Sequence, residues 1–210
     1  MTAVAPAAHD AAAVQRIALK VFLDERSALP PRDVIPVFHR WIQTRAVDGL
    51  LIDVADYTHL PTGPLVLLVG HEGRYVLDRG DDRLGLQYVR TQPLDGPLET
   101  RLRTVAGMLL RAARLLEEDA TLPGPVRFRG DEIEWVANDR LLAPNTPDTL
   151  AAVRPACESF LSALSGGAPW ILTPCAEPGA RFGIHARTAA RAPLEALAER
   201  LEPRAGARER

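Results

Sequence analysis

The amino-acid sequence predicts an α+β fold, in which a mainly antiparallel sheet carries helices packed on one face. Three observations predict this fold. Apolar residues alternate with other residues in 14–24, which is the period of a strand. Apolar residues recur at helical spacing along 95–119, which indicates a long amphipathic helix. Paired strand patterns joined by turn residues precede each later helix, so hairpins and helices are expected to alternate along the chain.

The chain opens with a strand–helix–strand unit. Residues 14–24 form its first predicted strand, and residues 50–60 form its second. If both strands share one sheet, a right-handed crossover makes them parallel. The run that follows, 65–70, is apolar at every position before its final glycine, so it is expected to be a central strand buried on both faces.

Three hairpin–helix units are expected after this opening. They lie near residues 65–119, 125–164 and 169–203. In the second unit, Gly130 and Asp131 mark the predicted turn of a hairpin that spans 125–139. The opening unit and the three hairpin–helix units together would place all the helices on one face of the sheet.

Two capping patterns predict where helices begin. Asp33 can cap the helix of the opening unit, because its side chain can accept a hydrogen bond from a free backbone N–H of the first turn. Thr146 is expected to cap the helix of the second hairpin–helix unit. Pro147 follows it at the first helical position, where proline needs no backbone donor.

We expect one domain spanning residues 14–203. The Ala-rich residues 1–13 and residues 204–210 have the composition of frayed ends. Residues 117–125 are the best candidate for a boundary if the chain divides into two subdomains. A single continuous sheet is the alternative.

Composition argues against two broad classes of partner. The chain has 210 residues, with 25 basic and 27 acidic side chains and a net charge of −2. A nucleic-acid or membrane-surface binder needs an excess of positive charge, so neither partner is expected. The first residues lack the basic start and apolar run of a signal peptide, and no stretch has the roughly 20 apolar residues of a membrane helix. We therefore expect a cytoplasmic protein.

His71 and Glu72 are the first candidate catalytic pair. They follow an apolar strand and stand between Gly70 and Gly73. Histidine titrates near neutral pH, and a carboxylate can orient it, which is the usual arrangement of a general base. Adjacent residues of a strand point to opposite faces, so the two side chains would share a site only if the chain bends there. A tight polar bend is the alternative interpretation, and the one we favour.

The strand over 50–60 carries a second candidate site. Alternation places Asp53, Tyr57 and His59 on one of its faces. If His71 ended the neighbouring strand, His59 could approach it, and the two histidines with Asp53 would be suitable ligands for zinc or iron. No HExxH or HxH spacing is present. A half-exposed strand whose polar face meets water is the alternative.

Near the C-terminus, Arg181, His185 and Arg187 are predicted to lie on one face of a strand. Three cationic or partly cationic groups in line could bind a phosphate or a carboxylate-bearing ligand. A solvated strand face, or an edge protected by charge, is the interpretation that we favour over a ligand site.

Four segments resemble a family of uncharacterised bacterial proteins of about this length: KVFLDERSALPPRDVIPVFHRWIQ, LLIDVADYTHLPTGP, VLLVGHEGRYVLD and RFRGDEIEWVANDRLLAPNT. The resemblance covers roughly residues 17–185. It implies a compact bacterial domain of its own kind. It assigns no activity, cofactor or partner, and therefore no functional residue.

The sequence leaves two classes of function open. The first is a non-catalytic protein that binds a protein partner or a small ligand, or associates with itself through a sheet edge or face. The alternative is a small enzyme that uses the histidines and carboxylates around His71 and His59, with or without a metal ion. The sequence names no cofactor for either.

Overall fold

The computed structural model describes residues 11–177 and 179–201. Its eight strands form one continuous antiparallel sheet in the order β2-β3-β4-β5-β1-β6-β8-β7. The strands are β1 (Ile17–Leu23), β2 (Leu51–Asp56), β3 (Gly63–Gly70), β4 (Gly73–Arg79), β5 (Gly85–Arg90), β6 (Phe128–Ala137), β7 (Ile171–Pro174) and β8 (Gly183–Arg187). Strands from before and after residues 117–125 belong to the same sheet, because β1 pairs with both β5 and β6. The structure therefore has the single continuous sheet.

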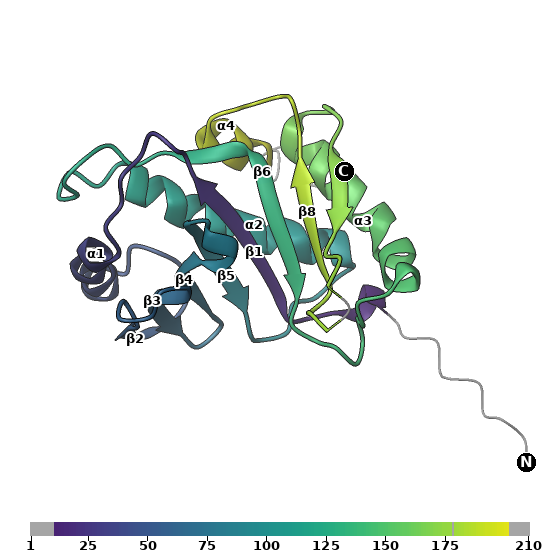
Figure 1. Cartoon of the computed structure of the whole chain (residues 1–210), viewed down its shortest axis with the longest axis horizontal. Helices are drawn as coiled ribbons and strands as arrows, with labels where there is room; N and C mark the ends of the chain where they lie inside the picture. Colours follow the sequence, from purple (N-terminus) through teal and green to yellow (C-terminus); the bar gives the residue numbers. More distant parts are fainter. Residues whose placement is uncertain (1–10, 178, 202–210) are drawn as a thin grey trace, which may run out of the picture.

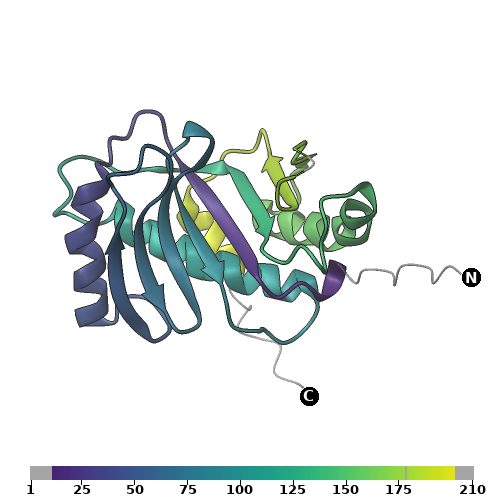
Figure 2. The same ribbon diagram turned by 60° about the horizontal axis from the view of Figure 1, so that its bottom comes forward.

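All four helices pack on one face of this sheet, as predicted. They are α1 (Pro31–Thr44), α2 (Leu98–Glu117), α3 (Pro147–Ser165) and α4 (Leu194–Leu201), and two short 3-10 turns, η1 (Ala11–Ala13) and η2 (Gly80–Asp82), complete the fold. Figure 1 shows α2 behind the middle of the sheet, with α1 at one end and α3 at the other. In Figure 2, α2 runs beneath the strands. The opposite face of the sheet, called the open face below, carries no helix of the described residues.

Strand β1 explains how the two faces differ. It lies between β5 and β6 in the middle of the sheet. Ile17, Leu19 and Val21 belong to the main apolar core beneath the helices. Ala18 belongs to a small separate apolar cluster, and Lys20 is the next residue of the same parity, because successive side chains of a strand alternate between faces. The open face therefore combines a small apolar floor with buried charge.

The two strands of the opening unit are parallel, as predicted, but they are not neighbours. Three antiparallel strands separate β2 from β1 in the sheet, which makes their directions the same. Helix α1 begins at Pro31, and Asp33 lies in its first turn without acting as the cap. Pro30 and Pro31 set the backbone for the helix start, because proline fixes φ near the helical value and needs no donor at that position.

The hairpin predicted for 125–139 is wrong. Residues 128–137 form one ten-residue strand, β6, which pairs with β1 on one side and β8 on the other. Gly130 is not a turn residue. A Cβ atom at this position would lie 1.9 Å from the carbonyl oxygen of Ala192. The glycine therefore lets the segment that leads into α4 cross directly over β6.

The other predicted elements lie close to their expected bounds. Thr146 caps α3 by accepting a hydrogen bond from the Thr149 N–H at 3.3 Å, as predicted. Strands β7 and β8 form the predicted hairpin within 169–187. The predicted N-terminal tail is too long by three residues, since η1 forms at 11–13 and Ala11 is buried in the core. Residues 1–10 and the predicted tail at 204–210 lie outside the described part.

Candidate functional site

His71 and Glu72 form the tight turn between β3 and β4. The His71 N–H donates to the Leu50 carbonyl at 2.8 Å, and the Leu50 N–H donates to Glu72 Oε2 at 2.9 Å. The hydrogen bond from Leu50 holds the pKa of Glu72 below its usual value. Glu72 is therefore an ionised group that fixes the start of β2. The polar-bend interpretation fits this geometry, in which both residues are engaged by the Leu50 backbone.

The structure does not bring the two proposed metal ligands together. His71 follows the last residue of β3, whereas His59 lies in the loop that precedes the first. The eight residues of β3 separate these turns by about 20 Å, so no ion can bind both side chains. The proposed His59–His71 metal site is therefore wrong. Among residues 11–177 and 179–201, no group of three His, Cys, Asp or Glu side chains could hold a metal ion.

The other proposed catalytic residues are Asp53 and Tyr57, and both are exposed. Asp53 lies in β2, and Tyr57 is the first residue after it. Asp53 pairs in register with Val69, so it lies in the same row of the sheet as an apolar residue. Asp53 Oδ1 accepts a hydrogen bond from the Val54 N–H at 2.8 Å. The Tyr57 ring contacts His59, with 6.3 Å between centroids. Asp53 lies within β2, whereas Tyr57 and His59 follow its last residue, and the three side chains do not meet at one point.

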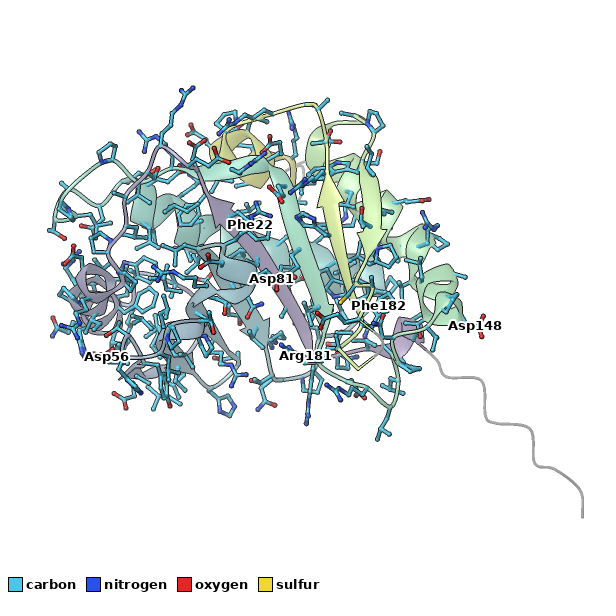
Figure 3. All side chains as sticks on the ribbon, viewed as in Figure 1. Phe22, Asp56, Asp81, Asp148, Arg181 and Phe182 are labelled. Carbon is cyan, nitrogen blue, oxygen red and sulfur yellow. The ribbon has the colours of Figure 1, made fainter. Side chains whose placement is uncertain are left out.

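His185 and Arg187 do converge, but on a carboxylate of the protein itself. Arg187 Nη2 lies 2.9 Å from Glu132 Oε1, and His185 Nε2 lies against the same oxygen. Arg181 lies apart from them and donates to the Asn138 side chain. Figure 3 shows Arg181 toward one end of β1 and β6 and Phe22 toward the other. The predicted row of three cations therefore divides into a pair and a separate residue.

Glu132, which the sequence analysis did not single out, is the centre of a charged cluster on the open face. Its side chain is fully buried on β6. Arg83 binds both carboxylate oxygens, at 2.6 and 2.8 Å, and Arg129 lies 3.4 Å from Oε2. Burial opposes ionisation, but the hydrogen bonds from Arg83 and Arg187 outweigh it and hold the pKa of Glu132 at about 2. We call Glu132 and its four partners, Arg83, Arg129, His185 and Arg187, the Glu132 cluster.

Aromatic and cationic groups extend this cluster across β1. The Arg83 guanidinium stacks 3.9 Å from the centre of the Phe22 ring. Lys20, which is buried, donates to Asp78 Oδ2 at 2.6 Å and to the Arg83 carbonyl at 2.9 Å. Burial lowers the pKa of His185, and the neighbouring Glu132 carboxylate only partly opposes this effect. Asp131 pairs with Arg129 as well, at 3.1 Å, so two carboxylates, Glu132 and Asp131, face the three arginines of the cluster. The cluster links β6, β8 and the segment before β5 through these ion pairs.

Two hollows of the described surface are lined by charged residues. The larger, about 890 Å³, lies between the end of α2 and the segment before α4. Arg114 pairs there with Glu118 and Glu195, and Arg191 pairs with Asp24. The smaller, about 470 Å³, borders Phe22 and Arg83. In the smaller hollow, Arg83 and Arg129 bind Glu132, whereas Glu25, Arg79 and Asp82 form no salt bridge among the described residues.

The β2 edge differs from the rest of the described surface. Six large apolar side chains are exposed among the described residues, and four of them gather at β2 and its two ends: Leu50, Ile52, Tyr57 and Leu60. Leu50 and Ile52 are 64% and 59% exposed. Among the described strands, β2 ends the sheet and has β3 as its one neighbour. An exposed apolar patch on a free edge strand is typical of a protein-binding surface.

No protein-family model matches the chain, and a search of curated proteins finds no match. Membership of the family that the sequence resembles therefore stays a prediction. Within the described residues, no helix has the length and apolar character needed to span a membrane.

Proposed function

We propose that this is a non-catalytic cytoplasmic protein that binds a protein partner through the β2 edge. The observation that carries the proposal is the gathering of four of six exposed large apolar side chains at one free edge strand. Burying such side chains against a partner removes apolar surface from water, at roughly 25 cal/mol per Å² of area. An edge strand also offers backbone groups for pairing, which gives a partner both affinity and register.

The positions of the predicted catalytic residues favour a binding role over the enzymatic alternative. His71 and His59 lie at opposite ends of β3, and Glu72 is engaged by the Leu50 backbone. A general base must lie within hydrogen-bond reach of its orienting group and of the substrate. The separated histidines do not provide that arrangement, whereas the β2 edge already has the character of a docking surface.

The test compares two exposed apolar residues as glutamate variants of the full chain. Ile52→Glu places a charge on the β2 edge, and Leu141→Glu is the matched control at an 82% exposed site outside β2 and its flanking loops. Each tagged protein is used to isolate stoichiometric complexes from cells of its own source. We expect one partner to be retained by the wild-type chain and by Leu141→Glu, and to be lost with Ile52→Glu at unchanged thermal stability. A partner retained equally by all three proteins would overturn the proposal.

A further inference from the structure

We infer that the partner presents an extended segment in which apolar residues alternate with lysine or arginine, and that this segment adds to the sheet as a ninth strand beside β2. The inference rests on the proposed function and specifies the partner's chemistry. Three features of the edge carry it: the direction of its backbone groups, the carboxylates along it, and the unfavourable charge pattern of a second copy.

The outer edge of β2 presents backbone groups at alternate residues. The Tyr57 N–H donates to the Leu65 carbonyl at 2.8 Å, so this residue faces β3. By the period of two, Ala55 also faces β3, and the N–H and C=O groups of Val54 and Asp56 face outward. These are the groups that an added strand would pair with. The register of β2 against β3 shifts between Leu51 and Asp53, so the regular part of this edge is residues 53–56.

The Asp53 carboxylate occupies one of these outward donors. It accepts from the Val54 N–H at 2.8 Å, and no Lys or Arg among the described residues forms a salt bridge with it. An added strand must take the place of this carboxylate at the Val54 N–H. A cationic side chain on the incoming strand stabilises the released carboxylate, which an apolar or acidic strand cannot do.

Two further carboxylates, Asp56 and Glu72, lie at the two ends of this edge. Asp56 accepts from the Thr58 N–H at 2.8 Å, which lowers its pKa, and Glu72 is held ionised at the start of β2. Figure 3 places Asp56 toward the α1 end of the molecule and Phe22 nearer its middle. Arg32, which donates to the Thr58 hydroxyl at 3.3 Å, and His59 are the cationic or partly cationic neighbours of Asp56. The edge therefore combines exposed apolar side chains with negative charge, and a basic and apolar strand complements both.

A second copy of this chain fits the edge less well. Pairing β2 with β2 of another copy would bring Asp53 and Asp56 of both chains into one small area. Like charges on neighbouring strands destabilise the pairing. The charge pattern of β2 therefore favours a different protein over self-association.

The experiment selects binders from a displayed library of random twelve-residue peptides, with the full chain as target. We expect enriched peptides to alternate apolar residues with Lys or Arg, and to lose binding to Ile52→Glu. A double variant, Asp53→Asn with Asp56→Asn, keeps the side-chain oxygens that accept from Val54 and Thr58 but removes both charges. It should bind these peptides about tenfold more weakly at low salt. Asp148→Asn, at the start of α3, is the control for net charge and should bind normally.

The outcomes separate the inference from the proposed function. Peptides that depend on Ile52 but show no Lys or Arg enrichment, or that bind the double variant normally, would overturn the basic-strand inference and leave the β2 docking surface intact. Failure to obtain any peptide that depends on Ile52 would overturn both. A dimer of the full chain that Ile52→Glu dissociates would identify a second copy as the occupant and would also contradict the inference.

Discussion

Replacing Glu132 by glutamine is expected to destabilise the protein by about 2 kcal/mol at pH 7. The buried carboxylate binds Arg83 and Arg187, and its pKa of about 2 reports how strongly these neighbours favour the charged form. A pKa lowered this far below 4.5 corresponds to about 3 kcal/mol, and the partial exposure of both arginines lowers the expected loss. Urea unfolding of Glu132→Gln and the wild-type chain measures this difference.

The same variant has a defined pH dependence. A carboxyl whose pKa is lower in the folded state stabilises the protein fully above its unfolded pKa, here about 4.5. That contribution is lost as pH falls toward about 2, where Glu132 becomes protonated in the folded state as well. The stability difference between wild-type and Glu132→Gln should therefore be constant from pH 7 to about 5 and shrink on further acidification.

Glu134 provides the matched control for this prediction. It lies two residues from Glu132 on β6, but it forms no salt bridge among the described residues, and burial raises its pKa. Glu134→Gln removes a charge that the folded state disfavours, so it should leave stability at pH 7 unchanged or slightly higher. Equal losses for the two variants would contradict the account of Glu132 as the centre of the charged cluster.

Gly130→Ala is expected to destabilise the protein by about 3 kcal/mol. The added Cβ would lie 1.9 Å from the Ala192 carbonyl oxygen and 3.3 Å from Leu197 Cδ1. Because the first of these atoms belongs to the backbone, relief requires the segment before α4 to move away from β6. Overpacking of this kind typically costs 1–3 kcal/mol and sometimes more. Thermal and urea unfolding measure the loss.

Gly107→Ala is the control for the added methyl group. Gly107 lies in α2, and a Cβ there would meet no atom within 4 Å. Alanine favours a helix over glycine by about 1 kcal/mol, so this variant should be more stable than the wild-type chain. If Gly130→Ala were as stable as the wild-type protein, the crossing of residue 192 over β6 would not be as close as described.

Gly130 also explains why the hairpin predicted for residues 125–139 does not form. A Gly-Asp pair between two apolar patterns is typical of a hairpin turn, and this local pattern predicted two short strands. In the structure the glycine serves a contact with a segment 62 residues later, Ala192, which no local pattern reveals. The Thr146 cap and the apolar stripe of α2 depend on neighbouring residues and could be predicted correctly. The predicted Asp33 cap was wrong, because Pro30 and Pro31 place the start of α1 two residues before Asp33.

The candidate sites, like Gly130, depend on contacts between segments that lie far apart in the sequence. Glu132 takes its cluster partners from β6, from the segment before β5 and from β8, and strand order alone brings Arg83 and Arg187 together there. The sequence predicted His185 and Arg187 as ligand-binding residues, but it could not identify Glu132 as the carboxylate that they contact. It also predicted a polar site along 50–60, whereas the position of β2 at the end of the sheet makes that segment an exposed edge.

The most direct test of the proposed β2 docking surface is amide hydrogen exchange, measured by NMR on the full chain with and without the most enriched peptide from the selection. Strand addition predicts slower exchange at the outward N–H groups of Val54 and Asp56, and unchanged exchange at Thr173 on β7, the opposite edge strand. Unchanged exchange at Val54 and Asp56, with protection appearing elsewhere when the peptide binds, would contradict the β2 edge as the docking surface.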